Sequence, residues 1–326
     1  MKARVLITGG AGYIGSHANL DLAAEGFETV VLDNLVYGHR DLVQAGEFLL
    51  GDTGDADLLD LVFEKYRIDA VMHFAAFTAV GESVENPAAF YENNVGNTIT
   101  LLDAMRRAGV NNFVFSSTCA VYGLPRRIPL DEAHPRAPVS PYGRTKLMIE
   151  QILEDYSRAY GLKSLILRYF NAAGADPGGR VGERHVPETH LIPLAIEAAL
   201  DPARELRVFG TDYDTPDGTC IRDYIHVSDL AAAHRLGLER MLDGGPGGVF
   251  NLGNGAGFSV REVLDCVSRV AGKEVKWSET ARRAGDPPVL VGSSAGIEAE
   301  LGWKPGHPDL EEIVRTALAW RTSGRF

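Results

Sequence analysis

Positive charge, cysteine and long apolar runs are all scarce in this sequence of 326 residues. Lys and Arg number 32 against 44 Asp and Glu, and the net charge is −12 at pH 7. No basic block is present that would neutralise a run of phosphates, so we expect no nucleic-acid partner. No stretch of roughly 18 apolar residues occurs, so we also expect no membrane-spanning helix and no membrane partner.

The three cysteines are Cys119, Cys220 and Cys266, an odd number at wide spacing. This pattern argues against a disulfide framework and against a Cys-x-x-Cys metal site, and it is typical of a reducing compartment. The N-terminal apolar run stops at a glycine pair, which is typical of a strand and not of a signal peptide. We therefore expect a cytoplasmic protein.

What is present is an alternation of short apolar runs with longer amphipathic segments. We expect strands at 4–7, 28–33, 47–51, 70–75, 112–117 and 164–170, with helices at 13–25, 56–66, 85–108 and 142–160. Apolar strands that alternate with helices indicate a parallel sheet covered on both faces. From about residue 175 Gly and Pro become frequent and the alternation becomes irregular. The pattern predicts an α/β protein with a doubly wound parallel sheet and a smaller C-terminal α/β substrate lobe.

The stretch "VLITGGAGYIGS" places Gly9, Gly12 and Gly15 directly after the first strand and at the start of a helix. Residues without Cβ allow a tight turn, and a pyrophosphate can then bind at the helix N-terminus. Asp33 ends the second strand, where a carboxylate binds the ribose of NAD and repels the 2′-phosphate of NADP. Asp52 ends the third strand and is a candidate for the adenine edge, although a strand-end or helix-capping role is equally open. These residues predict a Rossmann-type NAD-binding domain over 1–174, with a second, substrate-binding lobe over 175–326 that is interleaved with the last strands of the sheet.

In "SPYGRTK", Tyr142 precedes Lys146 by one helical turn. A tyrosine hydroxyl has a pKa near 10, and a lysine ammonium one turn away would lower this pKa and favour the phenolate. Such a tyrosine can remove an alcohol proton while hydride leaves the carbon. "FVFSSTCAVYG" supplies a hydroxyl at the end of the preceding strand, and Thr118 fits this role better than Ser116 or Ser117. For Ser117 we expect a backbone-capping role. Together with the glycine turn, this set resembles the short-chain dehydrogenase/reductase family.

The length resembles the extended branch of that family, and several ordered motifs resemble the UDP-galactose 4-epimerases over nearly the whole chain. These motifs include "TGGAGYIGSH", "HFAAFTAVGESVENP", "FSSTCAVYG", "SPYGRTKLMIEQIL", "LRYFNAAGA", "DGTCIRDYIHVSDLA" and "RRAGDPP". The resemblance implies reversible oxidation at C4 of a UDP-sugar with bound NAD, and a homodimer formed by the helices near 85–108 and 142–160. A dehydratase of this branch carries Asp-Glu after the threonine, whereas Cys119 and Ala120 follow Thr118 here. We expect Cys119 to be a buried, inert thiol.

The resemblance also assigns residues to the two ligands. Besides the residues already named, those expected to border NAD are Tyr13, Ile14, Asn34, Thr53, Phe74, Ala75, Ala76, Asn93, Ser116, Tyr142, Lys146, Tyr169 and Phe170. Those expected to line the UDP-sugar site are Thr118, Asn171, His190, Leu191, Phe209, Arg222, Tyr224, Arg283, Asp286 and Leu290. Two arginines near a diphosphate make physical sense because a guanidinium matches paired phosphate oxygens.

By the same resemblance, counting from Arg283 and Asp286, Leu290 is expected at the position that limits room beside C2 of the sugar, where a tyrosine excludes N-acetyl groups and a cysteine admits them. We therefore expect mainly UDP-glucose and UDP-galactose as substrates, with some UDP-GlcNAc turnover. The alternatives are a 4-epimerase of another UDP-sugar, such as UDP-GlcNAc, UDP-glucuronate or a UDP-pentose, a net NAD-dependent dehydrogenase, or a non-catalytic NAD-binding protein. His185, His190 and His226 lack a spacing such as His-Glu-x-x-His, so we expect no metal site, and we expect His226 to be a packed or capping residue.

Overall fold

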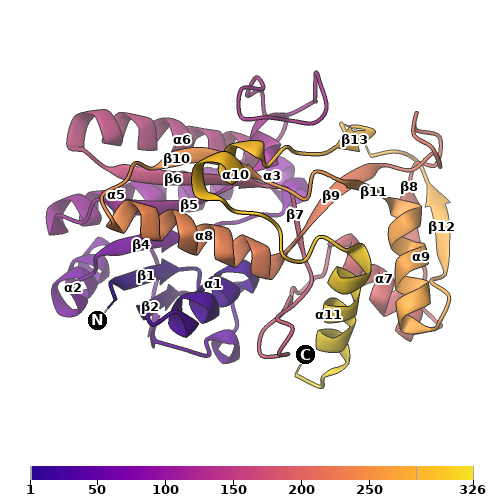
Figure 1. The fold of residues 1–326 in the computed structure, drawn as a ribbon, viewed down its shortest axis with the longest axis horizontal. Helices are drawn as coiled ribbons and strands as arrows, with labels where there is room; N and C mark the ends of the chain where they lie inside the picture. The colour runs from indigo at the N-terminus through magenta and orange to yellow at the C-terminus, as the bar shows by residue number, and fades with distance from the viewer. Residues whose placement is uncertain (1, 284, 326) are drawn as a thin grey trace.

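A seven-stranded parallel sheet forms the centre of the larger lobe (Figure 1). The structure, a computed structural model, describes residues 2–283 and 285–325. The strand order is β3-β2-β1-β4-β5-β6-β10. The strands are β1 (Arg4–Thr8), β2 (Glu28–Asp33), β3 (Glu47–Leu50), β4 (Ala70–His73), β5 (Asn112–Thr118), β6 (Lys163–Tyr169) and β10 (Gly248–Leu252). The six strands expected from the sequence are therefore confirmed to within two residues at each end, and the order reverses between β1 and β4 as in a doubly wound sheet.

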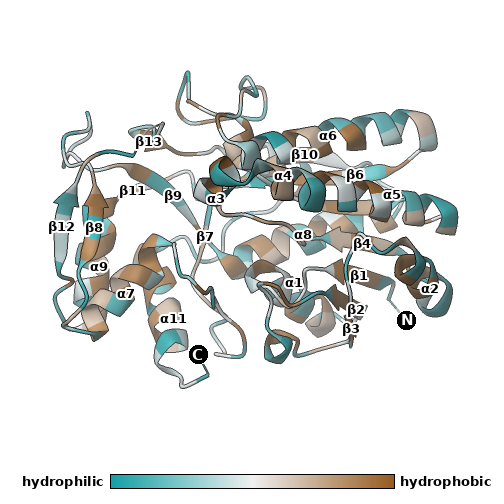
Figure 2. Cartoon of the chain, turned by 180° about the vertical axis from the view of Figure 1, so that it is seen from behind, coloured by the Kyte–Doolittle hydropathy of each residue, from teal (hydrophilic) through white to brown (hydrophobic). Residues whose placement is uncertain are grey.

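Both faces of this sheet are covered, which explains why its strands are continuous apolar runs. Val5 and Ile7 of β1 pack into one core cluster with α1 (Tyr13–Ala24) and α8 (Val227–Leu242), and Leu6 packs into a second cluster on the other face. The second cluster contains residues of α2 (Ala56–Tyr66), α5 (Asn97–Ala108) and α6 (Pro141–Tyr160). Helices α1 and α8 lie in front of the sheet in Figure 1, and α5 and α6 lie in front in Figure 2.

The single helix expected at 85–108 is wrong, because the chain is interrupted at Asn86 and Pro87. The structure has α3 (Val80–Glu85), α4 (Pro87–Phe90), a π-helical turn at Tyr91–Gly96 and then α5. Asn86 has φ −131° and ψ 66°, and a residue before proline is disfavoured from the helical region by the proline ring. The π-helical turn carries Asn93, and such turns are frequent at functional sites.

The smaller lobe lies beside the carboxyl ends of the central strands (Figure 1). Its strands form a four-stranded sheet from β7 (Asn171–Ala173), β9 (Ile221–His226), β11 (Gly257–Ser259) and β13 (Val289–Leu290), and a pair from β8 (Leu206–Phe209) and β12 (Trp277–Thr280). Its helices include α7 (Leu191–Leu200), α9 (Val260–Ala271) and α11 (Leu310–Thr322), which share a core cluster. The larger lobe draws α8 and β10 from beyond residue 174, so the two lobes interleave in sequence.

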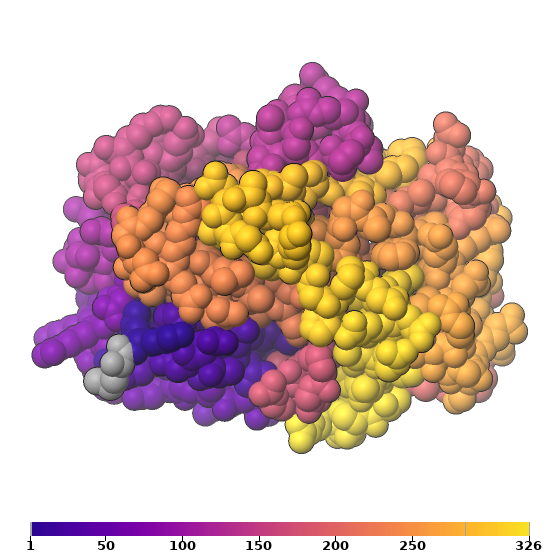
Figure 3. Space-filling view, viewed as in Figure 1, coloured from indigo at the N-terminus to yellow at the C-terminus, as the bar shows by residue number. Residues whose placement is uncertain are grey.

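The C-terminal segment also returns to the larger lobe. Helix α10 (Ala295–Leu301) contributes Ile297 to the core cluster that contains β10 and α8. In the space-filling view the yellow atoms of the C-terminal segment lie against the orange atoms of α8 (Figure 3). Among residues 2–283 and 285–325, no helix is long and apolar enough to cross a membrane.

Leu153 on α6 provides a test of the core that supports the site. Its side chain is 0% exposed, whereas Leu61 on α2 is 63% exposed. We expect Leu153→Ala to lower the free energy of unfolding by roughly 2–5 kcal/mol, because it removes buried methyl groups and leaves a cavity. Leu61→Ala is the control, with an expected change within about 0.5 kcal/mol. Urea denaturation followed by far-UV circular dichroism measures both, and equal effects would contradict this description of the core.

Candidate active site

The carboxyl ends of five neighbouring strands meet at one edge of the central sheet. Thr8 pairs with His73 in register, Thr118 pairs with Tyr169, and Asp33 ends the strand beside β1. In open parallel sheets ligands bind at this edge, where the strand order reverses. Several residues expected to bind the cofactor, such as Asn34 and Phe74, follow these strand ends directly.

The glycine turn after β1 is closely packed. Gly9 has φ +73°, and a Cβ on it would lie 2.5 Å from the backbone nitrogen of Ala75. A Cβ on Gly15 would lie 2.3 Å from the carbonyl oxygen of Gly9. Helix α1 begins at Tyr13, and its N-cap residue Gly12 makes no side-chain capping bond. The first N–H groups of α1 are therefore available to an anion, as the sequence predicts.

A pocket lies beside this turn. It is lined by Gly9, Gly12, Leu32, Asp33, Asn34, Val36, Tyr37, Gly38, Gly51, Asp52, Thr53, Phe74, Ala75, Ala76, Phe77 and Asn93. The lining therefore brings together ten residues that the sequence analysis assigns to the cofactor. Sequence reasoning missed Tyr37 and Phe77, whose rings meet edge to face at 5.6 Å. The one feature of the sequence that could have indicated them is that each aromatic residue stands four residues after the end of a strand.

Two carboxylates of this pocket have different surroundings. Asp33 accepts the N–H groups of Ala11 at 3.0 Å and Leu35 at 2.8 Å, and burial raises its pKa from the usual value. Each oxygen of Asp33 keeps a lone pair for a ribose hydroxyl. Asp52 accepts the side-chain amides of Asn34 at 2.7 Å and Asn97 at 3.0 Å. It also accepts the N–H of Gly54 at 2.7 Å, but the N-cap of α2 is Asp55, so the helix-capping role left open for Asp52 is wrong and its adenine role stays a prediction.

Tyr142 and Lys146 lie in the first turns of α6. Ser140 is the N-cap and accepts the N–H of Gly143 at 3.1 Å, and Pro141 occupies the first helical position, where no N–H is needed. The spacing of four residues places the tyrosine and the lysine on one face of the helix. This face is turned to the end of β5.

Lys146 is 2% exposed, and its ammonium Nζ donates a hydrogen bond to the carbonyl oxygen of Ser116 at 2.8 Å. The same Nζ lies 6.0 Å from the ring centroid of Tyr142 and 4.9 Å from that of Phe115. The hydroxyl of Ser116 is bonded to the hydroxyl of Tyr169. The structure thus brings Ser116, Tyr142, Lys146 and Tyr169 together, at strand and helix ends outside the lining of the pocket.

Burial dominates the ionisation of this pair. It lowers the pKa of Lys146 to about 7, against the opposing effect of Glu150. It raises the pKa of Tyr142 to about 12, against the effect of a hydrogen bond with Thr118. The depression of the Tyr142 pKa expected from Lys146 is absent from the protein alone, where desolvation of the phenolate is the largest effect. A positive charge from a bound ligand would be needed to reverse this balance.

A buried ion pair lies behind Lys146. Arg168 of β6 binds Glu150 of α6 through two hydrogen bonds, Nε to Oε1 at 2.9 Å and Nη2 to Oε2 at 2.6 Å. Ser117 donates its hydroxyl to Glu150 Oε1 at 2.6 Å, so the backbone-capping role expected for Ser117 is wrong. Sequence reasoning missed Glu150 and Arg168, since nothing in their local sequence marks them as partners.

Thr118 and Cys119 turn away from the strand end in a short 3-10 helix. Thr118 Oγ1 accepts the N–H of Ala120 at 3.2 Å, and the same hydroxyl is bonded to Tyr142. Cys119 is buried, and burial raises the pKa of its thiol to about 12. The expectation of an inert, buried thiol at Cys119 is confirmed.

Strands β8, β9 and β13 of the smaller lobe carry four of the ten expected substrate residues, Phe209, Arg222, Tyr224 and Leu290. Arg222 Nη2 lies 3.5 Å from Asp286 Oδ1, and the guanidinium of Arg283 lies 3.9 Å from the ring centroid of Phe209. In each contact the arginine and its partner are far apart in sequence, so tertiary packing brings them together. Such a pair of guanidinium groups is suited to a diphosphate.

Leu290 of β13 connects this lobe to the catalytic segment. It pairs in register with Arg222 and packs against the cluster that contains Cys119 and Phe170. Asn171 pairs in register with Tyr224, and the Asn171 side chain donates to the carbonyl of Asp223 at 2.8 Å. Leu290 is therefore close to the end of β5 where Thr118 lies.

Other expected residues have different surroundings. The hydroxyl of Tyr13 donates to the carbonyl of Gly174 at 2.6 Å, and Ile14 packs into the core, so neither side chain lines the pocket. His190 is the N-cap of α7, and Leu191 packs against the core of the smaller lobe. His226 is buried and accepts the N–H of Ser228 at 3.1 Å, which confirms its capping role.

Residues 5–253 match the sequence profile described as the NAD dependent epimerase/dehydratase family. The chain belongs to this family.

Members of the epimerase/dehydratase family resemble the chain over its whole length. The UDP-glucose 4-epimerase of Rhizobium meliloti is 52% identical over 318 residues, which cover 98% of this chain and 97% of the relative. The crystal structure of UDP-glucose 4-epimerase from Brucella ovis in complex with NAD is 51% identical with a TM-score of 0.95, covering 97% of this chain and 98% of that one. The structure of the UDP-Glc/GlcNAc 4-epimerase from Campylobacter jejuni is 42% identical with a TM-score of 0.87, covering 99% of this chain and 100% of that one.

NAD is the cofactor of this epimerase/dehydratase chain, and the residues fit it. A Cβ at Gly9 or Gly15 would collide with the backbone, so the turn stays narrow enough for a pyrophosphate to approach α1. Asp33 supplies a carboxylate with free lone pairs beside this turn. Both the narrow shape of the glycine turn and the carboxylate of Asp33 therefore fit NAD.

Glu150→Gln tests the ion pair behind Lys146. The change leaves the guanidinium of Arg168 buried without a charged partner, so we expect the free energy of unfolding to fall by about 3–5 kcal/mol. Glu154→Gln, on the same helix, is the control because its pair with Arg158 is exposed, and it should change stability by less than about 0.5 kcal/mol. Chemical denaturation measures both values. Equal stabilities of the two variants would show that the buried pair does not hold α6 on the sheet.

Proposed function

We propose that this protein is a UDP-glucose 4-epimerase, which interconverts UDP-galactose and UDP-glucose through a 4-keto intermediate. The observation that carries this proposal is the position of Tyr142 and Lys146 on α6, beside Ser116 and Thr118 at the same edge of the sheet as the glycine turn. Relatives that bear this name match the chain over nearly its whole length.

When bound, NAD accepts the hydride from C4 of the sugar and returns it to the other face. In our proposal Gly9, Gly12, Tyr13, Ile14 and Gly15 hold its pyrophosphate through backbone N–H groups, and Asp33 holds the adenosine ribose. The other proposed contacts are Asn34, Asp52, Thr53, Phe74, Ala75, Ala76, Asn93, Ser116, Tyr169 and Phe170.

Tyr142 is proposed as the residue that removes the proton of the 4-hydroxyl and gives it back. Its pKa of about 12 in the protein alone is too high for a base at neutral pH, and a cationic ring at the strand ends would lower it. Lys146, held by the carbonyl of Ser116, keeps a positive charge available beside the phenol when it is protonated. Thr118, bonded to Tyr142, would bind the same sugar oxygen and relay the proton.

The residues after Thr118 favour simple oxidation and reduction over elimination. Loss of water or carbon dioxide from the sugar would need an added acid or base next to Thr118. Cys119, with its pKa raised to about 12, and Ala120 supply neither. We therefore propose an epimerase and not a dehydratase.

The UDP-sugar is proposed to bind between the lobes. Arg222 and Arg283 would bind the diphosphate, with Asp286 orienting Arg222 through their contact of 3.5 Å. The other proposed contacts are Asn171, His190, Leu191, Phe209, Tyr224 and Leu290. In this proposal residues 1–174 supply the NAD-binding domain and residues 175–326 the UDP-sugar-binding lobe.

We further propose a cytoplasmic homodimer. The three cysteines are unpaired and buried, as suits a reducing compartment. Helices α5 and α6 are neighbours, since Tyr156 lies 3.2 Å from Asp103, and they expose Ile99 and Met148. Apolar side chains on two adjacent helices suit a symmetric contact with a second copy.

The test is proton NMR of UDP-galactose incubated with the purified protein and no added NAD. We expect conversion to an equilibrium mixture with UDP-glucose, by cofactor that copurifies. Tyr142→Phe should slow conversion by roughly 10²–10⁴-fold, because the proton acceptor is lost. Tyr160→Phe, an exposed tyrosine at the other end of α6, is the matched control and should retain wild-type rates.

Other outcomes point to the alternatives. Stoichiometric NADH absorbance at 340 nm with added NAD would indicate a net dehydrogenase and overturn the proposal. No turnover of UDP-galactose, with conversion of UDP-glucuronate or UDP-xylose, would indicate a 4-epimerase of another UDP-sugar. Full activity of Tyr142→Phe would show that the proton acceptor is a different group.

Leu290 gives a specificity prediction, motivated by its contact with the Cys119 cluster and by the Campylobacter relative named for both sugars. We expect weak UDP-GlcNAc turnover by the wild type. Leu290→Cys should increase the UDP-GlcNAc value of kcat/KM by about tenfold, because removing one or two methylenes of a pocket is worth about 1–3 kcal/mol. UDP-galactose turnover in the same variant is the internal control. The same low UDP-GlcNAc rate in both proteins would contradict this role.

A further inference from the structure

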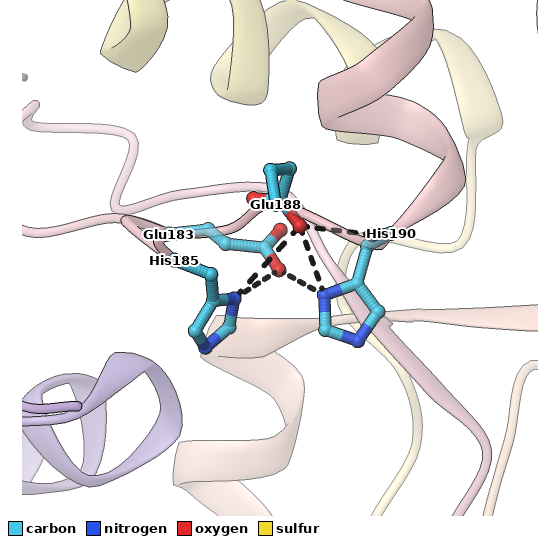
Figure 4. Close-up of side chains that lie close together, drawn as sticks. All are labelled: Glu183, His185, Glu188 and His190. Atoms are coloured by element: carbon cyan, nitrogen blue, oxygen red, sulfur yellow. Dashed lines mark hydrogen bonds and ion pairs between the residues drawn. The ribbon is translucent and has the colours of Figure 1, made fainter. Parts of the chain in front are cut away.

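Four side chains that the proposed chemistry does not use as acids or bases gather in the loop between β7 and α7. They are Glu183, His185, Glu188 and His190, within the stretch "GERHVPETH". One ligand atom from each lies within 4.8 Å of the other three. Figure 4 shows both carboxylates and both imidazoles directed at one point. This is the one such group of potential metal ligands within residues 2–283 and 285–325.

Of the four distances between these carboxylates and imidazoles, three suit donors around a shared centre, whereas the 2.5 Å between Glu183 and His190 is that of a hydrogen bond, which a bound ion would replace. Glu183 Oε1 lies 2.5 Å from His190 Nδ1 and 3.1 Å from His185 Nδ1. Glu188 Oε1 lies 3.4 Å from His190 Nδ1 and 4.0 Å from His185 Nδ1. Donors at about 2.0–2.2 Å around a tetrahedral ion are separated by roughly 3.3 Å, which falls inside this range.

Glu188 provides a second, independent observation that points to a cation. Its side chain is 5% exposed, and its Oε1 accepts the N–H groups of Thr189 at 2.7 Å and His190 at 2.9 Å. Its Oε2 is buried and has no hydrogen-bond partner among the described residues. A buried carboxylate oxygen without a partner is costly, and a cation is the usual way to satisfy it.

The backbone around the four residues is held from three sides. The indole N–H of Trp320 on α11 donates to the carbonyl of Glu183 at 2.9 Å. The ring of His39 binds the carbonyl of Arg184 at 2.9 Å, and the ring of Tyr13 meets that of His185 edge to face at 6.2 Å. The ligands are therefore positioned by parts of both lobes before any ion binds.

We propose that Glu183, His185, Glu188 and His190 form a structural Zn²⁺ site. Two imidazole nitrogens and two carboxylate oxygens suit zinc, and a complete set of four protein ligands is typical of structural and not catalytic zinc. The ion would fix the loop between β7 and α7 against α1 and α11. The expectation of no metal relied on the lack of a His-Glu-x-x-His spacing, which is typical of a helix. The four residues of this site have the spacing Glu-x-His-x-x-Glu-x-His, and they lie in a loop.

Direct binding tests the proposal with Zn²⁺ alone as the probe. Tag-free protein is treated with a chelator, dialysed against Zn²⁺ and measured by atomic emission. We expect one Zn²⁺ per chain, and Co²⁺ in its place should give the intense absorption between about 500 and 700 nm of a tetrahedral site. Loss of the metal by the folded wild type, or binding of Co²⁺ with the weak spectrum of an octahedral hydrated ion, would overturn the proposal.

Two variants test the ligands. His185→Gln and Glu188→Gln should each weaken Zn²⁺ binding by more than about 100-fold, since even indirect partners of a metal ligand are worth about 10–100-fold. Glu188→Gln keeps an amide oxygen for the N–H groups of Thr189 and His190, so its fold should be intact. His307→Gln is the matched control, because His307 also pairs with a glutamate, Glu312 at 2.7 Å, outside the cluster. Equal Zn²⁺ affinity in all three variants would show that the four residues form ion pairs only.

Thermal unfolding gives a readout that does not depend on activity. Excess Zn²⁺ should raise the Tm of the wild type and of His307→Gln by several degrees, because an ion that binds the folded state alone stabilises it. Neither His185→Gln nor Glu188→Gln should show this rise. A Zn²⁺-dependent rise of the same size in His185→Gln would place the bound ion elsewhere.

Discussion

The burial of one charged pair, Arg168 with Glu150, is the constraint on which the site depends. It joins β6 to α6, binds the hydroxyl of Ser117 on β5, and lies behind Lys146. A buried guanidinium needs such a partner with matched geometry, and this requirement orients the helix that carries Tyr142. The spacing of four residues places Tyr142 and Lys146 on one face of α6. The ion pair orients α6 so that this face is directed at the strand ends.

Desolvation then determines how the site can work. Burial lowers the pKa of Lys146 to about 7 and raises the pKa of Tyr142 to about 12, so the phenol of Tyr142 is protonated at neutral pH. Tyr142 therefore becomes a base at neutral pH only when further positive charge is brought to the strand ends. In such an arrangement, the ability of Tyr142 to lose its proton depends on whether a ligand occupies the pocket beside the glycine turn.

The two lobes meet at the same place for a geometric reason. The seven-stranded sheet ends where β7 and β9 of the smaller lobe begin, and Leu290 reaches from that lobe to the cluster around Cys119. The loop of the proposed zinc site begins directly after β7 and is held by residues of both lobes. The position of α7 relative to α1 therefore depends on a short segment whose own side chains are largely polar.

The sequence by itself determined those features that depend on neighbours in the chain. Continuous apolar runs predicted six central strands because both sheet faces are buried, the glycine spacing predicted the turn, and four-residue spacing placed Tyr142 with Lys146. Tertiary structure alone decided the pairing of Glu150 with Arg168, the ring contact of Tyr37 with Phe77, and the approach of Glu183 to His190. It also decided the pKa of Tyr142, which follows from burial rather than from the lysine beside it. These features arise where segments pack together although nothing in their own sequences identifies them as partners. The packing excludes water, and the loss of water changes the energy of every charge that becomes buried.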